Sequence, residues 1–108
     1  MKKVVWHPKA LGTVKGFPDE VRKELGYLIY RIQQGDSLGL PHSRPMRAVA
    51  SGVSELRVRG PDGAYRAFYF LKSAKGILVF HAFKKKSQQT PDYEIEQGTK
   101  QLEELLDG

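Results

Sequence analysis

The first third of the chain carries one short apolar run and one helical stripe. The run 3–6 is stopped by His7-Pro8, because proline has no N–H to donate to a β-ladder and restricts the residue before it. Residues 17–20 then place a proline and two carboxylates where a first helical turn favours them. Apolar side chains follow at spacings of 4, 3 and 4, at Val21, Leu25, Leu28 and Ile32. The pattern predicts an edge strand and then a helix that Gly35 ends.

The middle of the chain contains three runs that are typical of strands, at 55–59, 65–71 and 77–83. In the first run, the alternation of apolar and polar residues puts Leu56 and Val58 on one face. Glu55, Arg57 and Arg59 then share the other face. Lys72 to Gly76 provides the turn between the second run and the third.

Gly60-Pro61-Asp62-Gly63 predicts a tight turn between the first two runs, since proline presets one central dihedral and Asp and Gly suit the next positions. A symmetric hairpin closed by this turn sets Arg59 opposite Ala64 and Arg57 opposite Arg66. Two guanidinium groups on one face of a strand pair repel each other, so this register is costly unless an anion lies over them. The hairpin therefore indicates an anion site.

Two stretches remain. Residues 36–54 hold Gly39, Pro41, Pro45 and Gly52 and few periodic apolar positions, which is typical of a loop or a short broken helix. A second helix is expected after Thr90-Pro91-Asp92, with Thr90 as N-cap. Its Gly98 either weakens the helix by about 1 kcal/mol or lets it approach the sheet closely. The expected fold is α+β, with an N-terminal edge strand and helical segments, then an antiparallel sheet of three to four strands and a C-terminal helix.

Composition narrows the class of protein. With 108 residues, 40% hydrophobic and 28% charged, the chain is expected to form a single domain over 1–108. It has no Cys, which excludes disulfides and thiolate chemistry, and no apolar run approaches the roughly 20 residues that span a bilayer. A cytoplasmic protein is expected. Residues 1–90 carry 17 Lys/Arg and 6 Asp/Glu, a net charge of +11, while residues 91–108 carry 1 and 6, a net charge of −5. A basic body attracts polyanions, of which nucleic acid is the commonest.

The candidate chemistry lies in a basic sheet face. The three histidines have no metal-ligand spacing and no GxSxG motif is present, so no metal or other cofactor is expected. The basic residues of the predicted sheet and its exit are Arg57, Arg59, Arg66, His81, Lys84, Lys85 and Lys86. RNA can be cut by its own 2′-hydroxyl, so a protein need supply only positioning, charge stabilisation and proton transfer. Arginine suits the first two, and crowding lowers the pKa of an ammonium group, so one of the lysines could act as base or acid. The competing interpretation is that these basic residues are ordinary solvated surface charges and that the nearby aromatic residues belong to the core.

Several segments resemble the phage-derived Gp49-like/HigB group of the RelE/ParE toxin superfamily. They are Phe17-Pro18, Gln34-Gly35, Glu55-Leu56-Arg57, Tyr65-Arg66 with Phe68-Tyr69, and His81 to Lys86 leading to Thr90-Pro91. The resemblance implies two helical segments near the N-terminus and an antiparallel sheet that curls round a final helix. It also implies cleavage of mRNA on the ribosome and a cognate antitoxin, commonly a helix-turn-helix protein.

The resemblance also implies roles for particular residues. Arg66 matches the arginine that stabilises the transition-state phosphate, and Arg57 and Arg59 match phosphate contacts. Lys84, Lys85 and Lys86 match the basic patch that holds a base or acid. RelE-like toxins often place a tyrosine near the C-terminal helix against the substrate base, and Tyr93 is the nearest candidate. Glu55 stands where such enzymes have a lysine, which leaves the general base open.

Two other functions fit the same features. One is a non-catalytic RNA-binding module, and the other is a ParE-like inhibitor of a protein target, since one fold supports several functions. An inactive phage remnant is a further alternative. Cuts within the codons of translated mRNA would distinguish the enzyme from all of these.

Overall fold

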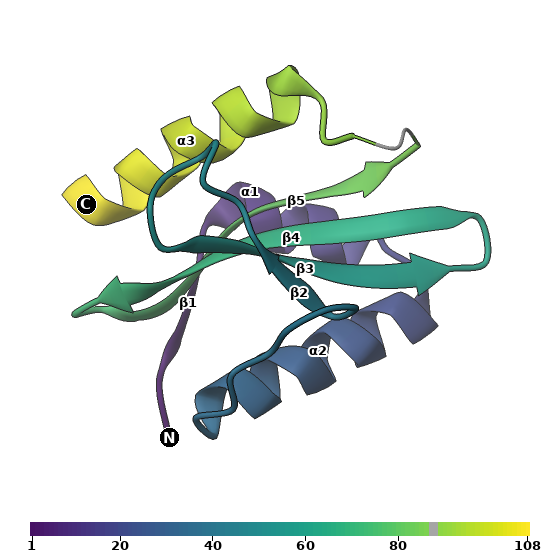
Figure 1. Cartoon of the computed structure of the whole chain (residues 1–108), viewed down its shortest axis with the longest axis horizontal. Helices are drawn as coiled ribbons and strands as arrows, with labels where there is room; N and C mark the ends of the chain where they lie inside the picture. The colour runs from purple at the N-terminus through teal and green to yellow at the C-terminus, as the bar shows by residue number, and fades with distance from the viewer. Residues whose placement is uncertain (87–88) are drawn as a thin grey trace.

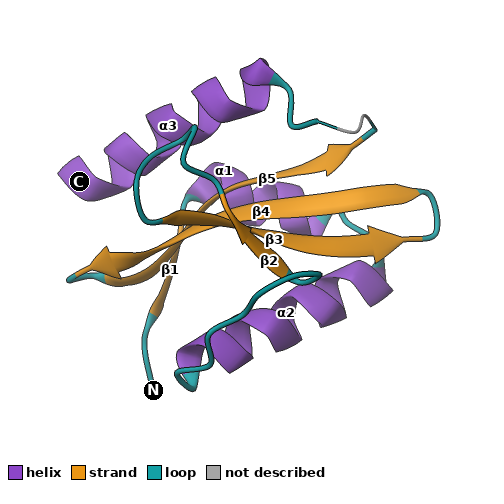
Figure 2. Cartoon of the chain, in the orientation of Figure 1, coloured by secondary structure: helices purple, strands orange, loops and turns teal. Residues whose placement is uncertain are grey.

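A computed structural model describes residues 1–86 and 89–108 of the chain (Figure 1). Within these ranges five strands form one mixed sheet in the order β1-β5-β4-β3-β2, and only the β1–β5 pair is parallel. The strands are β1 (Val4–Trp6), β2 (Ser43–Pro45), β3 (Val53–Gly60), β4 (Gly63–Ser73) and β5 (Gly76–Lys85), and the helices are α1 (Pro8–Lys15), α2 (Asp19–Gln33) and α3 (Asp92–Asp107). Helices α2 and α3 lie on opposite sides of the sheet (Figure 2). The expected α+β fold is confirmed.

The hairpin register expected from the turn at residues 60–63 is confirmed. Gly60 pairs with Gly63, Arg59 with Ala64 and Arg57 with Arg66. The hydroxyl of Tyr65 donates to Asp62 at 2.6 Å, which ties the turn to the strand that follows it. Because side chains alternate along a strand, this register fixes which residues share a face with Arg66.

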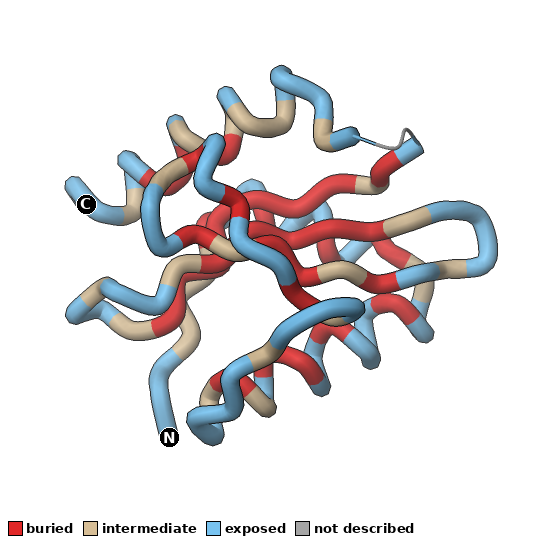
Figure 3. The backbone as a smooth tube through the Cα atoms, in the orientation of Figure 1, coloured by how far each residue is buried: buried red, intermediate tan, exposed pale blue. Residues whose placement is uncertain are grey.

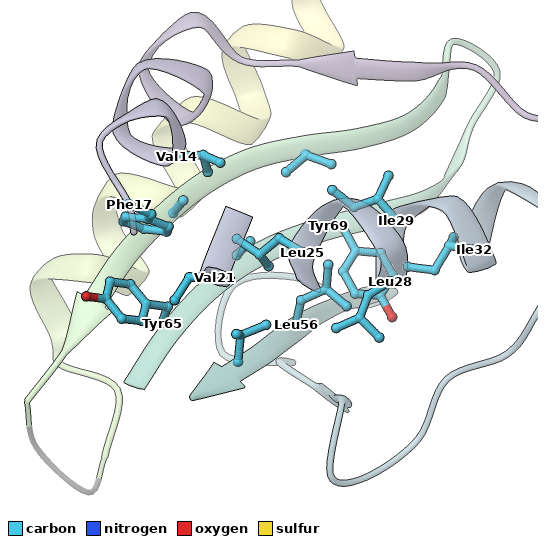
Figure 4. Close-up of a cluster of buried hydrophobic side chains, with 14 of the residues drawn as sticks. Val14, Phe17, Val21, Leu25, Leu28, Ile29, Ile32, Leu56, Tyr65 and Tyr69 are labelled. Atoms are coloured by element: carbon cyan, nitrogen blue, oxygen red, sulfur yellow. The ribbon is translucent and has the colours of Figure 1, made fainter. Parts of the chain in front are cut away.

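The stripe expected on the first long helix packs against one face of the sheet (Figure 4). Val21, Leu25, Leu28 and Ile32 are all buried, and α2 begins at Asp19, directly after Pro18. Gly35 follows the helix with a φ of 96°, in the left-handed region that glycine adopts without strain. The period of the apolar residues therefore predicted both the helix and the face that it buries.

The other face of the sheet packs under α3. This second cluster of buried side chains includes Phe68, Leu78, Phe80 and Leu102. A Cβ built on Gly98 would lie 2.8 Å from the Phe68 ring, so glycine at this position lets α3 lie close to the sheet. In Figure 3 the buried residues run along the middle of β4 and β5, while the β3–β4 turn is exposed.

Two elements lie where the sequence pattern indicated neither helix nor strand. The first, α1, begins at Pro8, and the His7 ring caps it because Nδ1 accepts a hydrogen bond from the Lys9 amide at 3.1 Å. The second, β2, lies within the stretch expected to be a loop or a short broken helix and pairs with β3, so the sheet gains a strand at the edge opposite the expected edge strand β1. A strand of only three residues, such as β2, is too short to show a periodic pattern of apolar residues, so the sequence could not reveal it.

The expected N-cap of the last helix is wrong. Pro91 occupies the cap position of α3, where no side chain caps the helix. The Thr90 hydroxyl instead donates to the Glu55 carboxylate at 3.2 Å. This contact joins the segment before α3 to the middle of β3.

Candidate functional site

A buried carboxylate lies at the centre of the basic face. Glu55 is 1% exposed, and its Oε1 lies 3.4 Å from Nε of Arg66 and 3.9 Å from Nε of Arg57. Arg44 of β2 pairs directly with Glu55, so its side chain leaves the sheet on the same face. Together with Lys85, these residues form what we call the basic cluster: Arg44, Arg57, Arg66 and Lys85 around Glu55. Two of these four cations, Arg57 and Arg66, form ion pairs with the carboxylate.

Arg66 is the most enclosed arginine of the cluster. Its side chain is 8% exposed, and Nη1 donates to the Tyr65 carbonyl at 3.2 Å. Burial lowers the pKa of its guanidinium; Glu55 opposes this shift, and Arg57 and Arg44 add to it. In the described residues, the buried Nε atoms of Arg57 and Arg66 have no hydrogen-bond partner. Buried donors that are ion-paired but not hydrogen-bonded favour an anion with acceptor oxygens.

The structure separates the three lysines that the sequence grouped together. Lys84 donates to Asp62 at 2.8 Å, and this hydrogen bond raises the pKa of the lysine. Lys86 follows the end of β5 and is exposed. Lys85 is 7% exposed, and burial, followed by the charge of Arg66, lowers the pKa of its ammonium group. The lowered pKa makes Lys85 better suited than Lys84 to exchange a proton.

The basic cluster opens onto solvent through two adjoining depressions. One has a volume of about 920 Å³ and is lined by Arg57, Arg59, Arg66, residues 60–64 and Lys84 to Lys86. The second, of about 380 Å³, shares the three arginines and extends to Pro41 and His42. In Figure 1 the turn between β3 and β4 extends beyond α3. We call the two depressions the arginine groove.

His81 and Tyr93 lie outside the arginine groove. Both line a third depression of about 580 Å³ between α1 and α3, where Tyr93 is 64% exposed. Both ring nitrogens of His81 are engaged: Nε2 lies 2.8 Å from the Glu94 carboxylate and Nδ1 lies 3.0 Å from the Gln101 amide nitrogen. The expected site residues therefore divide into two groups. Arg57, Arg59, Arg66 and the lysines form one group, and His81 and Tyr93 form the other.

From the sequence, Arg44 could equally be a contact to a nucleic-acid backbone or a solvated residue, and the role of Glu55 was left open. Arg44 falls in the expected loop, and only the β2–β3 register places it opposite Glu55. The sequence did single out Glu55, because it is the one acidic residue on the face of the run 55–59 that also carries Arg57 and Arg59. Its neighbour Arg66, however, comes from another strand, so the burial of the carboxylate could not be read locally.

The burial of His81 predicts that the stability of the fold depends on pH. The pKa of His81 lies below its ordinary value of 6.5, chiefly because burial disfavours the charged ring, although the Glu94 hydrogen bond acts in the opposite direction and His7 adds to the lowering. The neutral ring therefore stabilises the fold fully above pH 6.5, and this contribution is lost as the pH falls through the lower folded pKa.

We expect the free energy of unfolding, measured with urea, to decrease between about pH 7.5 and pH 5.5. His81→Gln should flatten this dependence, whereas His42→Gln, on the loop before β2, should leave it unchanged. An equally steep pH dependence in His81→Gln would contradict the assignment.

One comparison with known proteins identifies a family for this chain. A family model described as phage derived protein Gp49-like matches residues 13–103, which is most of the chain. No curated protein matches. In the described residues, no three His, Asp or Glu side chains lie close enough together to hold a metal ion. None of the described helices is both long and apolar enough to cross a bilayer.

Proposed function

This chain belongs to the phage-derived Gp49-like family of the RelE/ParE toxin superfamily, and we propose that it is a toxin that cuts mRNA on the ribosome. The observation that carries the proposal is the basic cluster, in which the buried Nε atoms of Arg57 and Arg66 are ion-paired with Glu55 but make no hydrogen bond within the described chain. Such a site fits the charge that develops on a phosphate under attack.

The proposed reaction uses a nucleophile that the RNA itself supplies. The 2′-oxygen attacks the adjacent phosphorus, the bond from phosphorus to the 5′-oxygen breaks, and a 2′,3′-cyclic phosphate forms. Arg66 and Arg57 donate to the non-bridging oxygens, whose negative charge grows in the transition state. One proton leaves the 2′-hydroxyl and one reaches the departing 5′-oxygen.

Lys85 is our candidate for one of these proton transfers. It shares the face of Arg66, since Phe83 pairs with Arg66 and Lys85 lies two residues further along the strand. Its lowered pKa increases the fraction of the side chain that is a neutral amine, the form that can accept a proton. Lys84 is less suited, because Asp62 holds it in the charged form. Arg59, Lys84 and Lys86 then contact flanking phosphates along the arginine groove.

Glu55 acts as a positioning residue in this proposal. Its carboxylate lies between Nε of Arg66 and Nε of Arg57, so it offsets the repulsion of two guanidinium groups that the hairpin sets side by side. Because Thr90 also donates to Glu55, the same carboxylate fixes the approach to α3. The sequence indicated that the Arg57–Arg66 pair needs a nearby anion, and Glu55 is such an anion within the chain itself.

The family membership also supports a partner and a compartment. A toxin of this superfamily implies a cognate antitoxin, for which we propose a helix-turn-helix protein. We place both in the cytoplasm, where translated mRNA is found. A neighbouring reading frame for such a protein would support this part of the proposal.

Lys85→Met tests the role of the lysine and the reaction together. We expect wild type to arrest growth and to leave cuts within the codons of translated mRNA, detected by primer extension. Lys85→Met should lower the cutting rate about 100-fold, as expected for loss of a general acid or base. The control Lys23→Met, on the exposed face of α2, should cut like wild type.

The outcome also decides between the functions that share this fold. Intact messages with halted replication would contradict RNA cleavage and favour a ParE-like action on a protein target. A Lys85→Met variant that cuts at the wild-type rate would leave cleavage standing and remove Lys85 from it.

A further inference from the structure

The second depression of the arginine groove contains a carboxylate that the reaction described above does not use. Among the described residues, Glu24 of α2 is the one acidic side chain that lines it. We propose that this depression is a guanine subsite, in which Glu24 reads the base of the nucleotide whose phosphate lies against Arg57 and Arg66. The inference rests on the proposed function and adds base selection to it. We call this depression the Glu24 pocket.

The walls of the Glu24 pocket come from α2, the loop after it and the β3–β4 hairpin. Glu24 lies three residues after Val21, which is buried against the sheet, so it stands at the border between helix and sheet. The loop that follows α2 runs back along the helix (Figure 1) and brings Pro41 and His42 to the pocket. The backbone N–H of Arg57 donates to the His42 carbonyl at 2.9 Å, which holds this loop against β3. The pocket is therefore formed before a ligand binds.

The Glu24 carboxylate is available to a ligand. Its residue is exposed, and in the part of the chain that the structure describes its side chain makes no hydrogen bond or ion pair. A carboxylate cannot bind a phosphate, because the two anions repel each other. It can accept hydrogen bonds from the N–H groups of a base. The arginines and Glu24 therefore suit different parts of one nucleotide, its phosphate and its base.

The chemistry of a carboxylate selects among the four bases of RNA. An ionised carboxylate has two oxygens that only accept hydrogen bonds. Guanine is the one RNA base whose Watson–Crick edge presents two neighbouring N–H donors, N1–H and the 2-amino group. Adenine and cytosine each place an acceptor nitrogen beside their amino group, and uracil has one N–H between two carbonyl oxygens. Those acceptors would face the carboxylate oxygens unpaired, so Glu24 favours guanine.

The size and the position of the Glu24 pocket suit one base. Its volume of about 380 Å³ falls within the range of small-molecule sites. Pro41 and His42 line it with flat rings, against which a planar base can lie. The pocket shares Arg57 and Arg66 with the larger depression of the groove. One nucleotide can therefore place its phosphate at the two arginines and its base at Glu24.

The test measures how fast the purified protein cuts ribosome-bound messages that differ only in the base beside the cut. We expect wild type to cut the message with guanine about 30-fold faster than messages with the other three bases, which is the discrimination of one bidentate contact. Inosine lacks the 2-amino group of guanosine and so loses one of the two donors. The message with inosine should therefore be cut about tenfold more slowly than the message with guanine.

Two variants of Glu24 should change this preference in different ways. Glu24→Ala removes the acceptor, so it should cut the guanine and inosine messages at rates within about twofold of each other. Glu24→Gln offers one acceptor and one donor, so its preference should move toward adenine or cytosine. Alanine and glutamine are good helix formers and Glu24 is exposed, so neither variant should melt lower than wild type. Glu20→Gln is the matched control, because Glu20 is exposed one turn earlier in α2 and lines neither depression.

A free guanine nucleotide carries the same two donors as a guanine in the message. Cutting is therefore also measured with added GMP or AMP. Equal, weak inhibition by both nucleotides is expected if the Glu24 pocket reads the message. Strong inhibition by GMP alone, together with equal cutting of the guanine and inosine messages, would assign the pocket to a free nucleotide and overturn the proposal.

The subsite and the proposed function fail in different ways. If wild type cuts messages but shows no preference for guanine, or if Glu24→Ala keeps that preference, Glu24 does not read the base and the proposed function survives. The same holds if Glu24→Ala slows cutting equally for all four bases. If wild type leaves every message intact, the proposed function is wrong and the subsite falls with it.

Discussion

Replacing Arg66 with alanine is expected to lower the rate of mRNA cleavage about 1,000-fold, the loss found when one preorganised donor to a developing oxyanion is removed. Arg66 is the most enclosed cation of the basic cluster, and its buried Nε is ion-paired with Glu55 but makes no hydrogen bond in the described chain. A charge held in a dry, fixed position stabilises the transition state more than an exposed one does. Expression of the variant should no longer arrest growth.

The control must separate chemistry from folding. Arg66→Ala leaves Glu55 without its nearest cation, so the unfolding of the purified variant has to be measured as well. Arg66→Lys keeps the charge but not the planar fork, and we expect it to recover stability more than cleavage. Arg47→Ala removes an exposed arginine that lines neither depression and should behave as wild type. Equal growth arrest and equal cutting in Arg66→Ala would end the assignment.

The second large effect is expected on stability. Glu55→Gln should lower the free energy of unfolding by about 3 kcal/mol, because removing one partner of a buried ion pair leaves the other charges uncompensated. The carboxylate is 1% exposed and lies within 4 Å of two guanidinium groups, so water cannot replace it easily. Glutamine keeps the shape and retains an oxygen that can accept from Thr90. The loss therefore reports on the charge.

An added anion should reverse part of this loss. If the basic cluster is an anion site, phosphate ions will occupy the place of the missing carboxylate, and the midpoint of urea unfolding of Glu55→Gln should rise with phosphate more steeply than that of wild type. Glu103→Gln on the exposed face of α3 controls for ionic strength. A Glu55→Gln variant as stable as wild type would show that the carboxylate does not offset the arginine charges.

Local patterns were sufficient for two parts of the molecule. The spacing of Val21, Leu25, Leu28 and Ile32 predicted α2 and its buried face, since a helix repeats its faces every few residues whatever it packs against. The turn at residues 60–63 predicted the pairing of Arg57 with Arg66, since a short turn leaves two strands one register. Both depend on neighbours in the chain, so both could be read from the sequence.

The sequence by itself thus determined α2, the β3–β4 hairpin, the cationic body and the family to which the chain belongs. The tertiary structure decided which basic residues gather around Glu55. Arg44, Glu55, Arg66 and Lys85 come from four strands, and only the sheet order brings them to one place. Lys85 differs from Lys84 and Lys86 because it is buried, and burial depends on all the residues packed around it. The sequence called for an anion over Arg57 and Arg66, and the fold supplies it from within the chain, as Glu55.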